Sequence, residues 1–262
     1  MSTVVHVSDL HFGPKHNPHL SELVLGDIRE LEPDLVILSG DFTLRGRMNE
    51  YEQAHAYIER IPAPVLSIPG NHDQPLHPSA LFERLGRPMK RYQRFIHGQT
   101  DTTFARGDLF VVGLNDNRPI LPGGFWSGRQ RRWIANELAG SPRDAYKIIV
   151  THHHLIWVKP RPLGVWNAAE KLAWLARQGV ELVLNGHTHV PLARKTPQGP
   201  VIAQAGTAMS GRVRQGHGNS YNLIHLSVNE IKILVRRYVE SADRFQAQEQ
   251  FLFPREMTRV AA

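Results

Sequence analysis

The chain of 262 residues contains no cysteine. This absence excludes disulfide bonds, thiolate catalysis and cysteine-ligated zinc, so any metal site must use imidazole, carboxylate, amide or water ligands. The chain also lacks an apolar run approaching the roughly 20 residues that a membrane-spanning helix needs. Residues 1–6 lack the basic and apolar regions of a signal peptide. We therefore expect a soluble, cytoplasmic protein.

The residues that are present describe a globular protein with a preference for anions. Hydrophobic residues make up 41% and charged residues 21% of the chain, which fits neither a disordered nor a fibrous protein. The length suits one large α/β domain. A net charge of +7 favours association with anions, phosphate-bearing substrates included. Of the 15 histidines, seven fall in four short segments, namely His11, His72, His152, His153, His154, His187 and His189.

Short apolar runs alternate with helical patterns over the first two thirds of the chain. Runs rich in Val, Ile and Leu predict buried strands at residues 3–8, 34–39, 64–68, 146–150 and 181–184. Amphipathic patterns with start and stop signals predict helices at residues 21–31, 49–60, 127–138 and 168–177. Because strand, helix and strand recur at about 30-residue spacing, we expect a parallel sheet covered by helices.

The pattern changes after Gly186. Four further runs, at residues 190–195, 200–205, 221–228 and 230–238, resemble strands of a meander, so a mixed or second sheet should follow. Residues 239–262 are rich in charge and lack a clear period. With no internal repeat in the chain, we expect one domain over residues 1–238 and a C-terminal tail over 239–262, either packed on the domain or mobile.

Polar segments follow five of the predicted strands, at residues 8–11, 40–41, 70–73, 151–154 and 185–189. Open α/β sheets bind their ligands at the carboxyl ends of strands, so these segments should converge. Asp9 and His11 flank a single residue, which directs both side chains to one side of an extended segment. His187 and His189 repeat this spacing. Each pair can therefore supply two ligands to one ion.

Asp41 supplies a carboxylate whose two oxygens can bridge two cations. Together with the Asp, Asn and His residues of the other segments, it makes a site for two divalent ions plausible, with the ions roughly 3.5–4 Å apart. Taken singly, Gly-Asp and Asn-His-Asp are also ordinary turn sequences. The conjunction of five such segments in order is what favours a metal site. The donor set suits Mn, Fe, Zn or Co without distinguishing them.

These segments resemble the signature of the calcineurin-like metallophosphoesterases, over residues 4 to about 190. The matching motifs are Asp9-x-His11, Gly40-Asp41, Gly70-Asn71-His72-Asp73, His152 and Gly186-His187-x-His189. The resemblance implies a four-layer α/β/β/α sandwich of two mixed sheets with the dimetal site at the sheet edge.

The resemblance also implies a role for each residue. One metal would be held by Asp9, His11 and His189 and the other by Asn71, His152 and His187, with Asp41 bridging the two. His72 would face the scissile phosphate as a catalytic residue, and Asp73 would orient it. Candidate residues to fix the ligands in place are Ser8, Thr151, Asn185 and Thr188.

The arrangement of the motifs resembles the bacterial class III cyclic-nucleotide phosphodiesterases and the glycerophosphodiesterases. It implies a hydrolase of small phosphodiesters such as 3',5'-cyclic nucleotides or glycerophosphodiesters. The UDP-2,3-diacylglucosamine hydrolases share the framework but usually carry Arg where His72 stands, so they are the weaker alternative. A nuclease is a further alternative, although we do not expect nucleic acid as a partner. A scaffold that had lost catalysis would have lost ligands, and this chain has all seven.

Segments outside the motifs leave alternatives open. Residues 155–166 include Trp157 and Trp166 and could stack a base, cover an acyl chain or only pack the rim of a pocket. Residues 113–119 could contact phosphate or form an exposed turn. Residues 87–96 predict a helix with one apolar and one basic face. The basic face is either solvated or a site for nucleic acid or for acidic lipid headgroups in peripheral contact with a membrane. The oligomeric state is not predicted.

Overall fold

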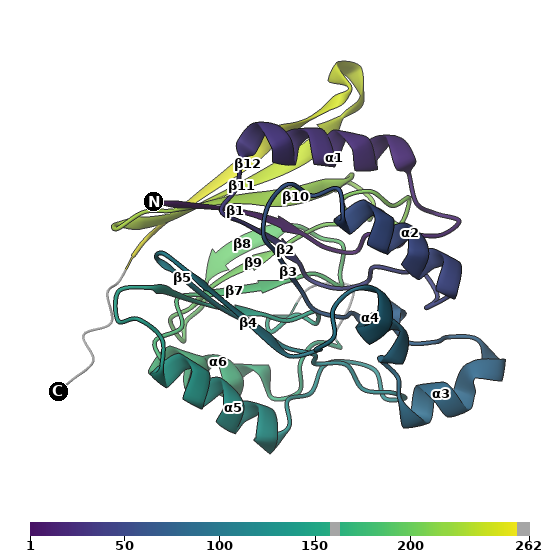
Figure 1. The fold of residues 1–262 in the computed structure, drawn as a ribbon. Helices are drawn as coiled ribbons and strands as arrows, with labels where there is room; N and C mark the ends of the chain where they lie inside the picture. The colour runs from purple at the N-terminus through teal and green to yellow at the C-terminus, as the bar shows by residue number, and fades with distance from the viewer. Residues whose placement is uncertain (158–162, 256–262) are drawn as a thin grey trace.

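The computed structural model describes residues 1–157 and 163–255. Within these residues the strands form two mixed six-stranded sheets, which face each other in the middle of the molecule (Figure 1). The first sheet has the order β12-β11-β10-β1-β2-β3 and the second has the order β4-β5-β6-β7-β9-β8. In the first sheet β1, β2 and β3 are parallel, and in the second β5, β6, β7 and β9 are parallel.

The elements have the following bounds. The strands are β1 (Ser2–Val7), β2 (Leu35–Leu38), β3 (Val65–Ser67), β4 (Thr102–Arg106), β5 (Leu109–Gly113), β6 (Tyr146–Val150), β7 (Leu182–Asn185), β8 (Leu192–Lys195), β9 (Val201–Gln204), β10 (Ser220–Leu226), β11 (Glu230–Val239) and β12 (Arg244–Pro254). The α-helices are α1 (Pro18–Leu31), α2 (Met48–Ile58), α3 (Leu81–Gly86), α4 (Lys90–Phe95), α5 (Gly128–Ala139) and α6 (Ala168–Arg177). Short 3₁₀ turns are η1 (Asn71–Asp73), η2 (Pro78–Ala80) and η3 (Glu240–Ala242).

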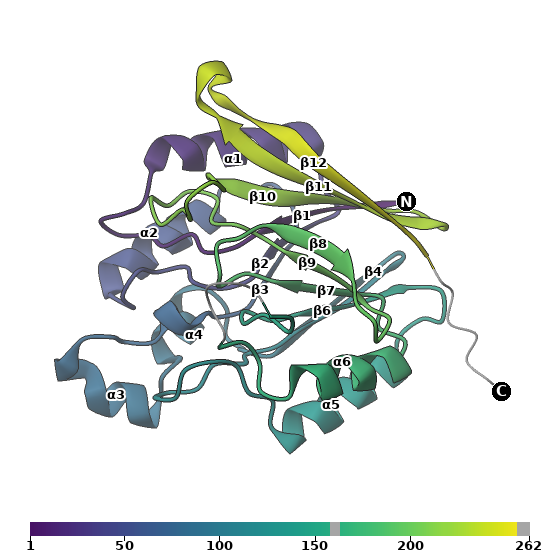
Figure 2. The ribbon, with the colours of Figure 1, turned by 180° about the vertical axis from the view of Figure 1, so that it is seen from behind.

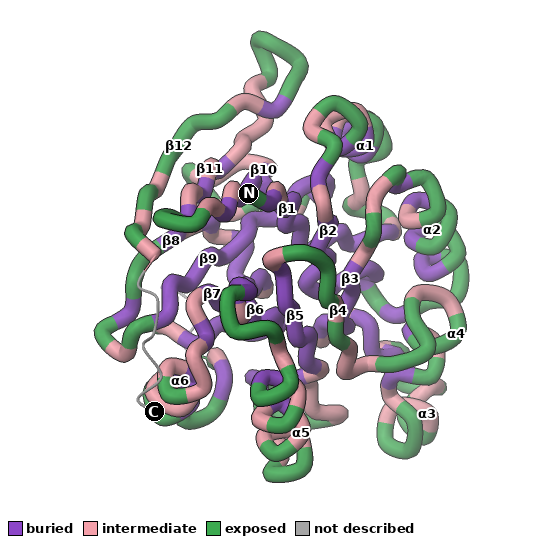
Figure 3. Tube along the Cα trace, turned by 60° about the vertical axis from the view of Figure 1, so that its left-hand side comes forward, coloured by how far each residue is buried: buried purple, intermediate pink, exposed green. Residues whose placement is uncertain are grey.

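Alternation along the strands separates three layers of apolar packing. Val5 and Val7 of β1 pack with Val24 of α1 on the outer face of the first sheet. Val4 points to the opposite side and joins a cluster between the two sheets that includes Ile148 of β6. The second sheet packs on α5 and α6 through a third cluster. The result is the α/β/β/α sandwich, in which purple buried strands fill the centre of Figure 3 and green exposed residues mark the outer helices.

The fold class predicted from the sequence is therefore confirmed, and the strands of the first two thirds lie where they are predicted. Ser127 caps α5, its hydroxyl accepting the N–H of Gln130 in a capping box. The parallel strands of this region are shared between the two sheets instead of forming one. The predicted meander is likewise divided, because β8 and β9 join the second sheet while β10 and β11 join the first (Figure 2).

The segment predicted as a C-terminal tail packs on the domain over most of its described length. Arg244–Pro254 forms β12, which pairs antiparallel with β11 along its whole length. The boundary expected at residue 238 therefore falls inside the β11–β12 hairpin. Residues 256–262 lie outside the described residues, as do residues 158–162, which include Lys159 and Arg161 of the 155–166 segment.

The basic segment at residues 87–96 forms a shorter helix than predicted, α4. Met89 and Tyr92 are buried in the cluster beneath α1 and α2, as expected for the apolar face. On the other face, Arg91 pairs with Glu83 of α3 at 2.7 Å and donates to the carbonyl of Gly46. The described helices include none with the length and apolar character needed to span a membrane.

One buried histidine couples the stability of the first sheet to pH. His6 of β1 is fully buried, with Nε2 2.9 Å from the Ser39 hydroxyl. Burial lowers the pKa of His6 to about 3, although the charge of Asp9 acts to raise it. Below the ordinary pKa of 6.5, His6 binds a proton in the unfolded chain but stays neutral in the folded chain. Stability should therefore fall as the pH drops from about 6.5 to about 3, by up to about 1.4 kcal/mol per pH unit.

We expect His6→Asn to remove this contribution. Urea unfolding between pH 4.5 and 7.5, with chelator present throughout, should show a shallower loss of unfolding free energy on acidification than in the wild type. The matched change His55→Asn, on the exposed side of α2, should keep the wild-type slope. Equal slopes for His6→Asn and the wild type would contradict the assignment.

Candidate functional site

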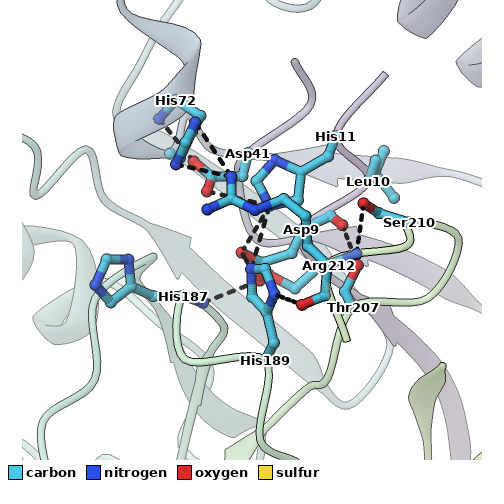
Figure 4. Close-up of polar contacts among 12 residues, drawn as sticks. Asp9, Leu10, His11, Asp41, His72, His187, His189, Thr207, Ser210 and Arg212 are labelled. Carbon is cyan, nitrogen blue, oxygen red and sulfur yellow. Dashed lines mark hydrogen bonds and ion pairs between the residues drawn. The ribbon is translucent and has the colours of Figure 1, made fainter. Parts of the chain in front are cut away.

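The motif residues meet where strands of both sheets end. Asp9 and His11 follow β1, Asp41 follows β2, Asn71 begins the turn after β3, His152 follows β6, and His187 and His189 follow β7. Parallel strands place their carboxyl ends at one edge of a sheet, and here two such edges lie next to each other. All seven predicted ligands are thereby brought into one cluster (Figure 4 shows most of them).

The backbone of the cluster is held in a sparsely populated conformation. Within the described residues, eight non-glycine residues have positive φ, and five of them are Asp9, His11, Asp41, His187 and His189. Such residues cost of order 1 kcal/mol or more each and concentrate at functional sites. Close packing at the same cluster requires glycine at two motif positions. A Cβ on Gly40, whose φ is +95°, would lie 2.7 Å from His152 Nδ1, and one on Gly186 would overlap the Ser8 hydroxyl.

Asp9, His11 and His189 form the first of two groups. Asp9 Oδ1 lies 3.0 Å from His189 Nε2 and 3.6 Å from His11 Nε2. The two Nε2 atoms are 3.2 Å apart. All three side chains are buried, and their atoms are close enough to hold one ion.

Asn71, His152 and His187 form the second group. Asn71 Oδ1 lies 3.1 Å from His152 Nε2 and 3.0 Å from His187 Nδ1. Asp41 lies between the groups, with Oδ1 3.4 Å from His152 Nε2 and Oδ2 3.7 Å from His11 Nε2. The two oxygens of one carboxylate therefore face different groups.

Backbone carbonyls orient three of the imidazoles. The Nδ1–H of His11 donates to the carbonyl of Thr43 at 3.3 Å. In the same way, the Nδ1–H of His152 donates to the carbonyl of Ser39 at 2.8 Å and that of His189 to the carbonyl of Arg212 at 2.7 Å. Each ring then turns Nε2 inward, which is the usual arrangement of a metal-binding histidine. His187 differs, because its Nδ1 faces the cluster.

Of the four residues considered for fixing the ligands, only Ser8 bonds to a predicted ligand. Its hydroxyl donates to Asp9 Oδ2 at 2.7 Å, and the N–H of His187 donates to the same oxygen at 2.9 Å. The Thr151 hydroxyl instead donates to the carbonyl of His153. Thr188 contacts Gln204, and the Asn185 amide is buried without a hydrogen-bond partner among the described residues.

The cluster is suited to binding cations. Asp9 Oδ1 is buried with no hydrogen-bond donor among the described residues, and the Nε2 lone pairs of His11 and His189 face each other. A cation would satisfy all three atoms. Burial lowers the pKa of His11 to about 4, which keeps this imidazole neutral as a ligand must be. Burial and the neighbouring His153 and His152 also hold the pKa of His187 well below its usual range.

The Asp41–His152 pair attracts positive charge to the second group. Burial alone would lower the pKa of His152, but the charge and hydrogen bond of Asp41, together with the charges of Asp9 and Asp116, outweigh burial and raise the pKa to about 10. Burial alone would raise the pKa of Asp41, which is instead lowered by His152 and His72. A proton on His152 and a metal ion are alternative ways to supply that charge.

His72 lies above Asp41 at the open side of the cluster. Its backbone N–H donates to Asp41 Oδ1 at 2.8 Å, and its ring Nδ1–H donates to the Leu44 carbonyl at 2.7 Å. The guanidinium of Arg212 lies against this ring, with Nη1 3.0 Å from Nε2 and 3.4 Å from Nδ1 (Figure 4). The ring centroids of His72 and His11 are 5.0 Å apart.

Asp73 acts differently from the expectation that it orients the His72 ring. Its carboxylate accepts hydrogen bonds from the N–H groups of Gly70, Phe42 and Thr43 and from the Thr43 hydroxyl. It therefore ties the turn after β3 to the segment after β2, and its influence on His72 is indirect. Burial, with a contribution from Asp41, raises the pKa of Asp73 to about 7.

Two residues near the cluster have no place in the motifs. Arg212 comes from the segment between β9 and β10, far along the chain. Asp116 is fully buried and accepts from His153 through both the N–H and Nδ1, at 3.0 and 3.1 Å. This pairing explains why His152 and not His153 turns into the cluster. The only local signal for Arg212 is a basic residue in a small-residue stretch, Ser210-Gly211-Arg212.

Known proteins share both the motifs and the fold. Residues 2–191 match the model of the family described as calcineurin-like phosphoesterase. The chain is 30% identical to the 3',5'-cyclic adenosine monophosphate phosphodiesterase CpdA of Escherichia coli, over 72% of this chain and 70% of that protein. It is 29% identical to a probable cyclic nucleotide phosphodiesterase of Synechococcus, over 63% of this chain and 62% of that protein.

Solved structures agree with this placement. A purple acid phosphatase from yellow lupin superposes with a TM-score of 0.71 at 14% identity, covering 97% of this chain and 54% of its own. A dimetal phosphatase from Danio rerio gives a TM-score of 0.66 at 16% identity, covering 97% and 98%. The motifs, the donor set that suits divalent metals and these comparisons lead to one conclusion: the chain belongs to the calcineurin-like phosphoesterase family and is a metal-dependent phosphoester hydrolase.

Proposed function

We propose that this protein hydrolyses a small phosphodiester, such as a 3',5'-cyclic nucleotide or a glycerophosphodiester, with two divalent cations. The observation that carries the proposal is the placement of Asp41 between two groups of ligands, one oxygen toward each. Relatives named as a cyclic AMP phosphodiesterase and as probable glycerophosphodiester phosphodiesterases support the substrate class.

The two groups define which residues would hold each cation. One would be held by Asp9, His11 and His189 and the other by Asn71, His152 and His187, with Asp41 shared. Nitrogen and oxygen ligands of this kind suit Mn, Fe, Zn or Co. When bound, the two cations would supply Lewis-acid activation of water and neutralise charge on the phosphoryl group. The chain itself contributes the geometry of the ligands, most of which are buried from water, and the groups that face the substrate.

His72 is the group best placed to act on the leaving oxygen. Its Nδ1–H is committed to the Leu44 carbonyl, so Nε2 is the atom that faces the open side. To act as a general acid, the ring must carry a second proton on Nε2 and transfer it to the departing oxygen. Asp41 accepts the His72 N–H and therefore fixes the position of this residue relative to the cluster.

A pocket next to Asn71 and His187 has room for a substituent of the phosphodiester. Its volume is about 310 Å³. Its lining also includes Gln74, His153, Arg84, Arg118, Ile120, Leu121 and Leu163. The aliphatic side chains and the two arginines make the pocket suitable for an uncharged or anionic group that is partly apolar.

Loss of the shared carboxylate should be the most damaging single ligand change. We expect Asp41→Ala to retain the fold but lose the second metal, with a fall in turnover well beyond the roughly 10- to 100-fold typical of losing a group that only supports a ligand. Elemental analysis and circular dichroism provide the measurements. Asp27→Ala removes a carboxylate that pairs with Arg236 outside the cluster and should retain both metals. Two metals per chain in Asp41→Ala would refute the bridging role.

The acid role of His72 can be separated from metal binding by varying the leaving group. An alkoxide needs a proton to depart, whereas p-nitrophenolate is a stable anion. His72→Ala should keep both metals and slow hydrolysis of an alkyl or ribose 3'-ester by roughly 10²–10⁴-fold, the usual range for acid–base catalysis. Hydrolysis of a p-nitrophenyl diester should slow far less. Equal losses on both substrates would instead assign His72 to binding or electrostatic stabilisation.

The proposal is tested by a substrate panel with purified protein and Mn²⁺. The panel contains bis-p-nitrophenyl phosphate, cyclic AMP, a glycerophosphodiester, UDP-2,3-diacylglucosamine and single-stranded DNA. We expect turnover of the first three. Cleavage of DNA alone would favour a nuclease, and no hydrolysis of any diester by protein with two metals bound would refute the proposal.

One observation favours a lipid-linked pyrophosphate as a second candidate substrate. Trp157 and Trp166 are 61% and 60% exposed, and Ile120 and Leu121 beside the pocket are 65% and 59% exposed. Of these four, Ile120 and Leu121 line the pocket, and exposed apolar side chains at a pocket are typical of sites for apolar ligands. Preferred hydrolysis of UDP-2,3-diacylglucosamine, with activity sensitive to detergent, would establish this alternative.

A further inference from the structure

Arg212 reaches the predicted metal centre from a segment outside the family motifs. Its carbonyl accepts from His189 Nδ1 at 2.7 Å, and the neighbouring Gly211 N–H donates to the Lys15 carbonyl at 2.8 Å. The Asn219 amide also donates to the carbonyl of Ser210 at 2.9 Å. The backbone of this segment is therefore fixed to the cluster, and the position of the Arg212 side chain follows from it.

The guanidinium of Arg212 has no acidic partner among the described residues. Other arginines of the fold are paired, for example Arg91 with Glu83 and Arg236 with Asp27. Arg212 instead approaches the His72 ring, with Nη1 3.0 Å from Nε2 and 3.4 Å from Nδ1. A guanidinium keeps its charge at any physiological pH, and an imidazole ring carries no negative charge to balance it. The open side of the cluster thus carries an uncompensated cation.

The remaining donors of Arg212 are available to an anion. A guanidinium offers five N–H donors in a planar fork that matches the oxygens of phosphate. In the described part of the chain only Nη1 has a hydrogen-bond partner, and that partner is the ring of His72. Figure 4 shows the guanidinium next to the His72 ring.

We propose that Arg212 binds a non-bridging oxygen of the substrate phosphoryl group through its remaining donors, beside the His72 ring. This inference rests on the proposed function and adds a substrate-binding residue to it. The same contact would hold the phosphate of the product, which carries more negative charge than a diester. Inorganic phosphate is therefore a suitable probe.

A purely structural role for Arg212 makes a different prediction. If Arg212 only holds the His72 ring in place, its removal should have no effect once His72 is absent. If Arg212 contacts phosphate itself, its removal should weaken phosphate binding to the same extent with and without His72. The Arg212 carbonyl, which orients His189, is retained in every side-chain variant, so metal binding should not change.

The experiment measures binding of inorganic phosphate by calorimetry to protein loaded with Mn²⁺, with metal content determined for each variant. Arg212→Ala should weaken binding by roughly tenfold to a hundredfold, as expected for loss of a hydrogen bond between charged groups. Arg212→Lys should lose less, because the charge remains without the fork. Arg212→Ala should cost the same factor in a His72→Ala background. Arg194→Ala, an exposed arginine of β8, controls for the change in net charge and should bind as the wild type does.

The possible outcomes separate this inference from the proposed function. Unchanged phosphate affinity in Arg212→Ala, or a loss that disappears in the His72→Ala background, would overturn the role of Arg212 and leave the proposed function intact. Wild-type protein that holds two metals but binds no phosphate would overturn both. Loss of metal from Arg212→Ala would show that the side chain supports the ligands, which also contradicts the inference.

Discussion

The burial of two like charges is the constraint on which the rest of the site depends. Asp9 and Asp41 are withdrawn from water, and an unpaired buried carboxylate is strongly destabilising. Each is compensated on one side by hydrogen-bond donors of the chain, the Ser8 hydroxyl and His187 N–H for Asp9 and the His72 N–H for Asp41. Their remaining oxygens face imidazoles. The fold therefore holds negative charge at fixed positions and leaves the balancing positive charge to a ligand.

The two-sheet architecture offsets the energetic cost of this arrangement. The carboxylates follow β1 and β2 of the first sheet, while His152, His187 and His189 follow strands of the second. The apolar cluster between the sheets fixes one set of strand ends against the other. That packing sets the spacing of the ligands and offsets the cost of the left-handed backbone at Asp9, Asp41 and the other strained positions. A single parallel sheet would have placed all of these residues along one line.

The sequence predicted what depends on local pattern. Strand ends followed by Asp, His and Gly were readable because burial, alternation and turn chemistry are properties of neighbouring residues, and the resemblance to a known family supplied the layer order and the residue roles. What could not be predicted arises from distant pairing. β12 is a mostly exposed edge strand whose apolar alternation is limited to its end, at Phe251 and Phe253. The division of the predicted meander depends on which sheet each hairpin joins. The same holds for side chains. Asp116 and Arg212 reach the cluster from loops whose sequence gives no spacing signal. Two of the partners of Asp73, Phe42 and Thr43, lie 31 and 30 positions away along the chain.

The charge balance of the site bears on which anions it can accept. Two carboxylates offset only half of the charge of two divalent cations, so the loaded centre would remain positive, and Arg212 adds a further charge on the open side. A phosphodiester with a single negative charge would leave the site short of negative charge. The monoester product, with more charge, would come closer to balancing it and should bind more tightly than the substrate. Such a site attracts the phosphoryl group more strongly as negative charge develops on it in the reaction. The same attraction slows the release of the product.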